Sequence, residues 1–214
     1  MSKPFLSAIL PVSKEIENLP LIISDVDQHL ENLKVPTELI VVSFGNKNNV
    51  GEIVKKMSEA VNNLKFVNAS ENSGIGDAIR QGMLLASGEI RLIIDSNNFI
   101  SAQNIKNMLP LFKAGADIVI GHRHLIQKTN PALFFKWFLP QPINFFFRKA
   151  FFKNLLKDPT SSFRGFTADS AEKIFSLSKS KNRNFLIETI KLAQKSNLRI
   201  QEVPVSITFP SYLV

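Results

Sequence analysis

Residues 64–94 read LKFVNASENSGIGDAIRQGMLLASGEIRLII, and this stretch decides the fold. Short, largely apolar runs stand at its two ends, at residues 64–67 and 90–94. Between them, apolar residues recur at helical spacing over 75–82, in a helix that we expect to end at Gly88. A strand, a crossing helix and a second strand favour parallel pairing. The stretch therefore predicts one βαβ unit.

The same order of elements recurs along the chain. Residues 5–10, 38–42 and 117–120 are further short apolar runs, and they are predicted to be buried parallel strands. A helix between the first two is predicted from apolar residues that share one helical face, namely Ile16, Leu19, Ile22, Ile23, Val26 and Leu30. The chain is thus predicted to be an α/β protein with a mostly parallel, doubly wound central sheet and helices on both faces.

Length and composition agree with one such domain. The 214 residues are 44% apolar, which is enough for one well-buried core, and we expect a single domain over residues 1–214. The absence of cysteine excludes a disulfide framework and thiolate metal sites. The N-terminus lacks the pattern of a secretory signal, and no run reaches the roughly 18 apolar residues that a membrane span needs. A cytoplasmic location is therefore predicted.

Positive charge is concentrated in one part of the chain. Residues 118–157 contain no acidic residue and seven Lys or Arg, which leaves about +1 of the formal charge of +8 for the rest. Eight of the eighteen Phe residues lie in the same run, so aromatic residues outnumber cations, unlike the pattern of a nucleic-acid platform. The run predicts a local anionic partner and no nucleic acid.

Residues 125–157, and within them 131–157, have the pattern of a membrane-interface segment. If the second half is helical, Phe147, Phe151 and Leu155 form one stripe, and the interleaved lysines lie roughly 200° away. An apolar face with cations opposite is typical of an amphipathic helix at a lipid surface. The alternative is a helix whose aromatic residues pack on the sheet or against a partner subunit.

Polar residues follow the predicted strands. Doubly wound sheets bind ligands outside the carboxyl ends of their strands. The candidate residues at these strand ends are Pro11, Ser13, Glu15, Ser43, Gly74, Gly76, Asp95, Ser96, Asn97 and Arg123.

With these motifs in this order, the chain resembles the family 2 glycosyltransferases of GT-A fold. It is most similar to the branch that moves a sugar from a nucleotide sugar onto dolichyl or another polyprenyl phosphate. Glu15 matches the acidic residue of the first turn, Asp95 the first carboxylate of an Asp-x-Asp motif, and residues 158–164 a turn close to Asp-x-Thr-Ser-Gly-Phe-Arg. Residues 202–204, Glu-Val-Pro, match the closing motif. The resemblance spans Leu6 to about Pro210.

The resemblance implies a nucleotide-sugar site with several departures. Its donor-binding residues would be Pro11, Ser13, Glu15, Ser43, Gly74, Gly76, Asp95, Ser96 and Asn97. Lys14 stands in place of an Asn, and Ser43 and Phe44 replace an acidic pair. Asn97 replaces the second carboxylate, so Mg²⁺ or Mn²⁺ held by Asp95 and Asn97 would bind weakly. Lys14 is a candidate for some of the missing positive charge.

The resemblance also implies an acceptor-phosphate site. Its residues would be Arg123, Lys136, Asp158, Ser161 and Arg164. Arginine binds phosphate oxygens in pairs and keeps its charge. Asp95, Arg123 and Arg164 are the predicted catalytic residues, gathered with Glu15 around one anionic guest. Gln141 stands where related enzymes carry another Arg.

Two motifs have a purely structural alternative. The turn at 72–76 resembles a glycine-rich phosphate loop that opens a helix, and a plain strand-to-helix turn with Ser73 as N-cap explains the same residues. Asp95 alone could likewise be a turn residue.

The remaining polar candidates also allow two interpretations. Arg164 could form an ion pair with Asp158 or Asp169 instead of binding phosphate. His122 and His124 are either metal ligands or surface residues.

These observations predict a peripheral membrane hexosyltransferase of cell envelope polysaccharide biosynthesis, acting at the inner face of the membrane. A phosphate oxygen is already ionised near neutral pH, since its second pKa is about 6, so the reaction needs alignment more than a strong base. The alternative is a pseudo-glycosyltransferase that serves as a binding or scaffold protein. A second copy of the chain or a membrane protein are further expected partners.

Overall fold

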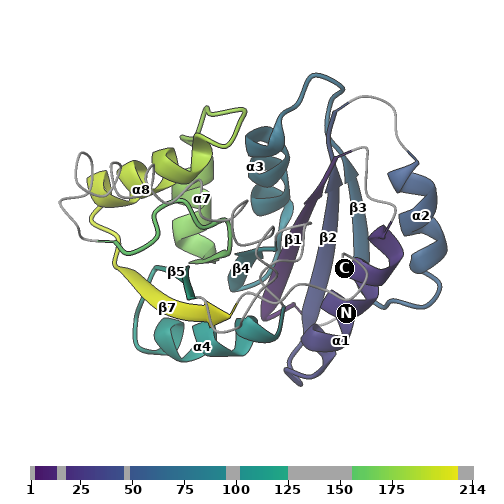
Figure 1. Cartoon of the computed structure of the whole chain (residues 1–214), viewed down its shortest axis with the longest axis horizontal. Helices are drawn as coiled ribbons and strands as arrows, with labels where there is room; N and C mark the ends of the chain where they lie inside the picture. Colours follow the sequence, from purple (N-terminus) through teal and green to yellow (C-terminus); the bar gives the residue numbers. More distant parts are fainter. Residues whose placement is uncertain (1–2, 14–17, 46–48, 95–101, 125–155, 207–214) are drawn as a thin grey trace, which may run out of the picture.

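A computed structural model of the whole chain describes residues 3–13, 18–45, 49–94, 102–124 and 156–206 (Figure 1). All five predicted strands form, each with ends within a few residues of those expected. In chain order the elements are β1 (Leu6–Val12), α1 (Leu19–Glu31), β2 (Thr37–Ser43), α2 (Val50–Met57), β3 (Leu64–Asn68), α3 (Ile75–Leu85), β4 (Ile90–Ile93), η1 (Ala102–Asn104), α4 (Ile105–Lys113), β5 (Ile118–His124), β6 (Arg164–Thr167), α7 (Ala168–Phe175), α8 (Phe185–Lys195) and β7 (Ile200–Ser206).

The described strands form one seven-stranded sheet in the order β3-β2-β1-β4-β6-β5-β7. Every neighbouring pair is parallel except the two that involve β6, which runs antiparallel to β4 and to β5. The prediction of a mostly parallel sheet is confirmed. Arg164, which was expected to end a turn, instead begins β6.

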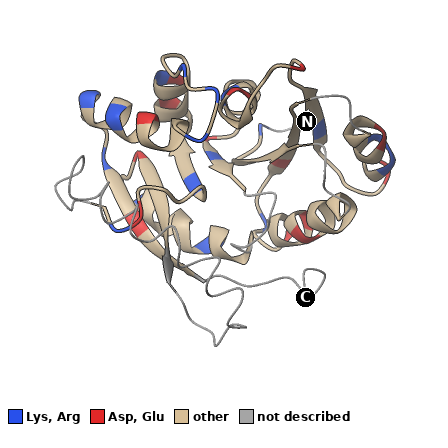
Figure 2. Ribbon diagram, turned by 45° about the horizontal axis from the view of Figure 1, so that its top comes forward, with Lys and Arg blue, Asp and Glu red and all other residues tan. Residues whose placement is uncertain are grey.

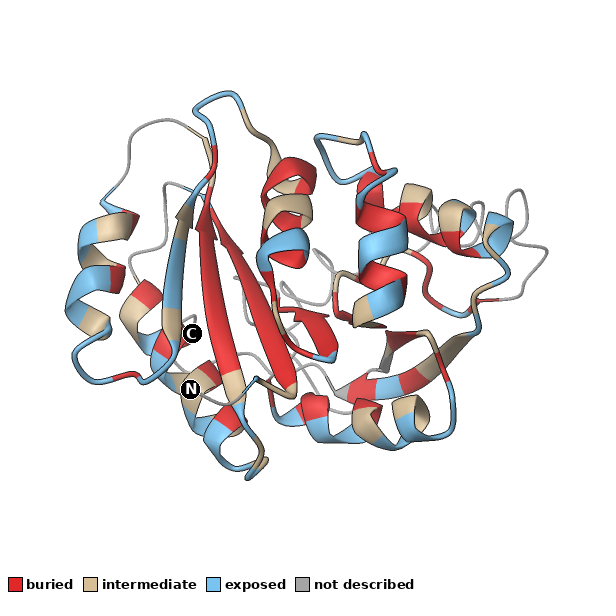
Figure 3. Cartoon of the chain, turned by 180° about the vertical axis from the view of Figure 1, so that it is seen from behind, coloured by how far each residue is buried: buried red, intermediate tan, exposed pale blue. Residues whose placement is uncertain are grey.

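Helices cover both faces of the sheet (Figures 1 and 3). Successive side chains of a strand point to opposite faces. In β1, Leu10 packs in the core with α1, α2 and α4, whereas its neighbour Ile9 packs with α3, α7 and α8. Figure 3 shows β1 and β2 buried along their length and β3, at the sheet edge, more exposed. This two-sided burial is what the near-continuous apolar strands predict.

Helix α1 forms as its periodicity predicts. Five of its predicted apolar residues are buried, and Pro20 lies in the first turn, where its missing N–H is tolerated. Ile16 lies outside the described residues. The expected end of α3 was wrong, because the helix stops at Leu85, before an extended Ala86. Gly88 lies beyond it and donates its N–H to Ser7 Oγ (2.8 Å).

Candidate active site

The carboxyl ends of β1, β2 and β3 lie level at one edge of the sheet. Val12 pairs with Ser43, and Ser43 with Asn68. Pro11 and Ser43 are buried, and Ser13, just beyond β1, is exposed. The predicted donor residues of β1 and β2 are thus adjacent in space. Lys14, Glu15, Asp95, Ser96 and Asn97 lie outside the described residues, and their roles remain predictions.

The turn 158–163 reaches the same edge from the other half of the sheet. Arg164, the first residue of β6, pairs with Ile93 of β4 and with Ile120 of β5. Phe163 accepts a hydrogen bond from the N–H of Gly121 (2.9 Å). Because β6 is antiparallel, the turn before it lies where β4 and β5 end. The topology therefore brings the predicted acceptor turn to the carboxyl edge.

The guanidinium of Arg164 is directed into the protein. Its side chain is 1% exposed, and it lies at the base of the turn, against α8. Its hydrogen bonds go to the carbonyl of Ser161 (2.7 Å), the carbonyl of Leu186 (2.6 Å), the hydroxyl of Thr189 (2.9 Å) and the carbonyl of Pro159. All three guanidinium nitrogens thus bind protein oxygens, which favours a structural over a phosphate-binding role. Three of these four partners are backbone carbonyls.

Within the turn, Asp158 and Ser161 are shielded from solvent, whereas Thr160 and Ser162 are half-buried. Asp158 is 6% exposed and accepts a hydrogen bond from the hydroxyl of Thr160 (3.1 Å). Ser161 is fully buried, and its hydroxyl has no hydrogen-bond partner among the residues described. The turn is therefore a compact unit, and contact of Asp158 or Ser161 with an acceptor phosphate remains a prediction.

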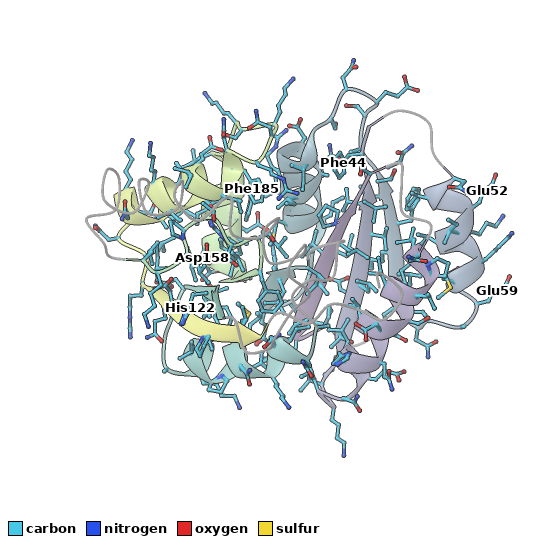
Figure 4. The ribbon with its side chains drawn as sticks, in the orientation of Figure 1. Phe44, Glu52, Glu59, His122, Asp158 and Phe185 are labelled. Carbon is cyan, nitrogen blue, oxygen red and sulfur yellow. The ribbon has the colours of Figure 1, made fainter. Side chains whose placement is uncertain are left out.

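The end of β5 supplies the remaining acceptor candidates. The backbone of Arg123 pairs with Val205 of β7, next to the pair of His122 with Pro204. Figure 4 shows His122 and Asp158 in the half of the molecule that holds β5 and β7, away from Phe44 at the end of β2. Lys136 lies outside the described residues.

The glycine-rich turn is packed against the loop between α7 and α8. The N–H of Gly76 donates to the carbonyl of Lys181 (2.8 Å), and that of Gly74 to Asp77 Oδ2 (3.3 Å). A Cβ atom on Gly74 would lie 2.1 Å from the Lys181 oxygen, and one on Gly76 2.1 Å from the Ser180 oxygen. Close packing alone therefore requires both glycines, which favours the structural alternative over a phosphate loop. The N-cap is Gly74 rather than the expected Ser73.

A buried carboxylate, Glu38, lies at the opposite edge of the sheet, where the strands β1 and β2 begin. The apolar pattern of the strands does not predict it. Most described charges lie on helices and loops (Figure 2), but Glu38, near the start of β2, is 3% exposed. Its Oε1 accepts hydrogen bonds from the hydroxyl of Ser7 (2.6 Å) and from the N–H (2.7 Å) and hydroxyl (2.9 Å) of Ser87. Its Oε2 lies 2.5 Å from Lys65 Nζ. Burial by itself would raise the pKa of Glu38, but Lys65, Ser7 and Ser87 outweigh it and hold that pKa below its ordinary value.

A second carboxylate, Glu202 of β7, binds the backbone at the start of the turn 158–163. It accepts the backbone N–H of Lys157 at 2.9 Å and that of Asp158 at 3.1 Å. Sequence comparison pointed to this residue through the Glu-Val-Pro motif but gave it no role. Its partners lie 44 and 45 residues away, so no local pattern could reveal them.

The part of the chain that the structure describes offers no group of three His, Asp or Glu that could hold a metal ion. The interpretation of His122 and His124 as metal ligands gains no support there. Among the same residues, no helix is both long and apolar enough to cross a bilayer.

The chain belongs to glycosyl transferase family 2, whose model matches residues 7–175. It is 28% identical over 218 residues to a dolichyl-phosphate beta-glucosyltransferase of Dictyostelium discoideum, covering 95% of this chain and 66% of that protein. It is also 27% identical over 119 residues to a dolichol-phosphate mannosyltransferase of Pyrococcus furiosus, covering 56% of this chain and 33% of that protein.

The fold agrees with solved glycosyltransferase structures. Glucosyl-3-phosphoglycerate synthase from Mycobacterium tuberculosis, in complex with Mn²⁺, uridine-diphosphate and phosphoglyceric acid, superposes with a TM-score of 0.67 at 16% identity, over 95% of this chain and 69% of that one. The resemblance to a family 2 enzyme of GT-A fold is confirmed. The chain spans slightly less than two thirds of four dolichyl-phosphate glucosyltransferases that it matches, at 64% to 66% of their lengths.

Proposed function

We propose that the protein transfers a hexose from a nucleotide sugar to a polyprenyl phosphate. The similarity to dolichyl-phosphate glucosyltransferases along 95% of the chain carries the proposal. The geometry supports it, because the ends of β1 and β2 and the turn 158–163 lie at one edge of one sheet.

The two halves of this edge have different proposed partners. The nucleotide sugar binds beside Pro11, Ser13 and Ser43, with Glu15 and Asp95 completing the donor site. The lipid phosphate binds on the side of the turn, with Arg123 and Lys136 as its cationic contacts. The phosphate oxygen attacks the anomeric carbon of the sugar, the bond to the nucleotide diphosphate breaks, and the diphosphate leaves. Ionisation of the phosphate near neutral pH makes it a competent nucleophile without a strong base.

The geometry assigns Arg164 a part in this reaction other than the one its sequence position suggested. Its guanidinium holds the turn from inside, so we propose that it positions the acceptor side rather than contacting a phosphate. Gly74 and Gly76 similarly support the donor side through the packing of α3.

Asp95 and Asn97 are the residues that would hold a divalent cation in this protein. Solved relatives contain Mn²⁺ or Mg²⁺ together with uridine-diphosphate. The residues described supply no metal-binding group, and an Asn carbonyl lacks the charge of the carboxylate it replaces. We expect such a cation to bind weakly, at the diphosphate.

A scaffold function is the second candidate. The observation that favours it is the end of β2, where Ser43 is 1% exposed and Phe44 follows, in place of the acidic pair of the family. A pseudo-enzyme would keep the fold and the lipid-facing segment without binding a donor.

Calorimetry separates the two candidates. Nucleotide sugars, with UDP-glucose and GDP-mannose among them, would be titrated into the protein with and without Mn²⁺ or Mg²⁺. The enzyme predicts micromolar binding of at least one sugar. Silence across the panel would favour the scaffold.

The proposed location is the inner face of the membrane, through residues 131–157. Liposomes that contain anionic lipid would be floated with the protein and with a Phe147→Glu, Phe151→Glu double variant. Flotation should fall sharply in the variant while the circular dichroism of the domain is unchanged. Equal flotation of the two proteins would contradict the membrane contact.

A further inference from the structure

Glu202 lies in the third position of β7, opposite Ile120 of β5. Both of its carboxylate oxygens lie 2.9 Å from the N–H nitrogen of Lys157, and Oε1 lies 3.1 Å from that of Asp158. A carboxylate can only accept hydrogen bonds, and bonds to an ionised acceptor are about twice as strong as neutral ones. Glu202 therefore fixes the chain at the entrance of the turn.

The exit of the same turn is fixed independently. Arg164 donates to the carbonyls of Pro159 and Ser161 and ties both to α8 through Leu186 and Thr189. Between the two anchors the turn is closed on itself, because the N–H of Ser161 donates to the carbonyl of Asp158 (3.3 Å). An anion of β7 and a cation of β6 thus hold residues 157–163 from opposite ends.

We propose that Glu202 is a positioning residue for acceptor binding, acting through the turn 157–163 without touching the lipid phosphate. This inference rests on the proposed function. A turn whose backbone is fixed before the acceptor arrives loses less conformational entropy on binding. Loss of the Glu202 carboxylate releases two N–H groups at the entrance, while Arg164 still holds the exit. The donor half of the edge, at β1 and β2, keeps all its contacts.

Glu188 of α8 provides a matched control. Its carboxylate makes the same kind of contact with a different loop, accepting the N–H groups of Lys179 and Ser180 (3.0 Å each) and the hydroxyl of Ser178 (2.6 Å). Removing it should loosen residues 178–182 and leave the acceptor turn in place. The Glu202 and Glu188 variants therefore remove the same kind of hydrogen-bond acceptor at two different places in the fold.

The test compares the full chain with Glu202→Ala, Glu202→Gln and Glu188→Ala in two measurements. Amide hydrogen exchange by mass spectrometry reports peptides over 157–163 and 178–182. Steady-state kinetics give KM for a short-chain polyprenyl phosphate and, separately, for the nucleotide sugar. Thermal unfolding is recorded for every variant to establish that it is folded.

Glu202→Ala should accelerate exchange in 157–163 alone and raise the acceptor KM by about tenfold, as loss of a charge-assisted hydrogen bond predicts, with the donor KM unchanged. Glu202→Gln keeps one carbonyl oxygen and should restore part of both effects. Glu188→Ala should accelerate exchange in 178–182 and leave the acceptor KM unchanged.

Two results would overturn the inference. One is unchanged exchange in 157–163 in both Glu202 variants; the other is a loosened turn with an unchanged acceptor KM. If the unaltered protein transfers no sugar, the proposed function has failed. The exchange measurement then still decides whether Glu202 holds the turn.

Discussion

Two carboxylates of the same sheet accept backbone N–H groups, and they lie in regions with different tasks. Glu38 lies at the amino ends of β1 and β2, where it joins two strands to the turn before β4. Glu202 lies in β7, where it binds the backbone of a turn at the edge that holds the candidate active site. A carboxylate of this kind therefore indicates a function only through the backbone groups that it binds, whether it is buried like Glu38 or half-buried like Glu202. We expect substitution of Glu38 to lower the stability of the fold. Substitution of Glu202 or Arg164 should affect the candidate active site as well.

The largest effect is expected at Arg164, which serves both the fold and the turn. Arg164→Ala removes four hydrogen bonds and leaves buried carbonyls without a donor, so the free energy of unfolding should fall by at least about 3 kcal/mol. Urea unfolding measures the change. Arg164→Lys keeps the charge without the planar fork and is the control, with a smaller loss expected. A loss below about 1 kcal/mol for the alanine variant would contradict the structural role.

The second largest effect is expected for Glu38→Ala, which tests whether Glu38 serves the fold alone. The hydroxyl of Ser7 and the N–H of Ser87 lose their acceptor, which should lower the free energy of unfolding by about 2 kcal/mol. The KM values of the folded variant should stay unchanged, since the network lies at the edge opposite the candidate active site. A raised acceptor KM without loss of stability would break the distinction between the two carboxylates.

Gly76→Ala should cost about 1–2 kcal/mol in unfolding free energy, as overpacking does. The new Cβ would lie 2.1 Å from the carbonyl oxygen of Ser180, so the loop over α3 must move. Exchange at residues 178–182 should rise with it. Gly45→Ala separates steric from backbone effects, because Gly45 has a positive φ of 85° and, among the described residues, no atom lies within 4 Å of the added Cβ. Unchanged exchange in Gly76→Ala would show that the packing tolerates the methyl group.

The smallest effect concerns pH. Because the pKa of Glu38 is lower in the folded protein, the unfolded chain takes up the proton first as pH falls below the ordinary value of 4.5. The stability that Glu38 contributes is therefore complete above that pH and is lost as pH falls through the folded pKa. The difference in unfolding free energy between the protein and Glu38→Gln should shrink over that range. A constant difference down to pH 3 would contradict the assignment.

The strands that were predicted and those that were missed differ in a physical way. The buried strands β1, β2, β4 and β5 show as apolar runs, and the more exposed edge strand β3 was predicted from a similar run. Strand β6 is only four residues long, follows the turn-forming residues 158–162, and begins with a buried Arg164, so it gives no such run. Its place in the sheet depends on β4 and β5 on either side of it.

The sequence predicts which positions along the chain belong to the candidate site, but not the contacts that their side chains make. The ends of β1 and β2 and the turn 158–163 lie at the same edge of the sheet. The partners of Arg164, at Leu186 and Thr189, lie 22 and 25 residues further along, and nothing local marks them. Gly74 and Gly76 could be identified from the sequence, but their role could not, because a phosphate-binding loop and a tightly packed turn both require glycine. Spatial contacts, here with Ser180 and Lys181, were needed to choose between them.

A transfer assay tests the central claim most directly. The full chain would be incubated with radiolabelled UDP-glucose or GDP-mannose and a polyprenyl phosphate in vesicles, with and without Mn²⁺. The proposed sugar transfer predicts label in an organic-soluble, acid-labile lipid product that depends on the polyprenyl phosphate. No labelled lipid from any donor, with the protein folded and bound to the vesicles, would contradict it.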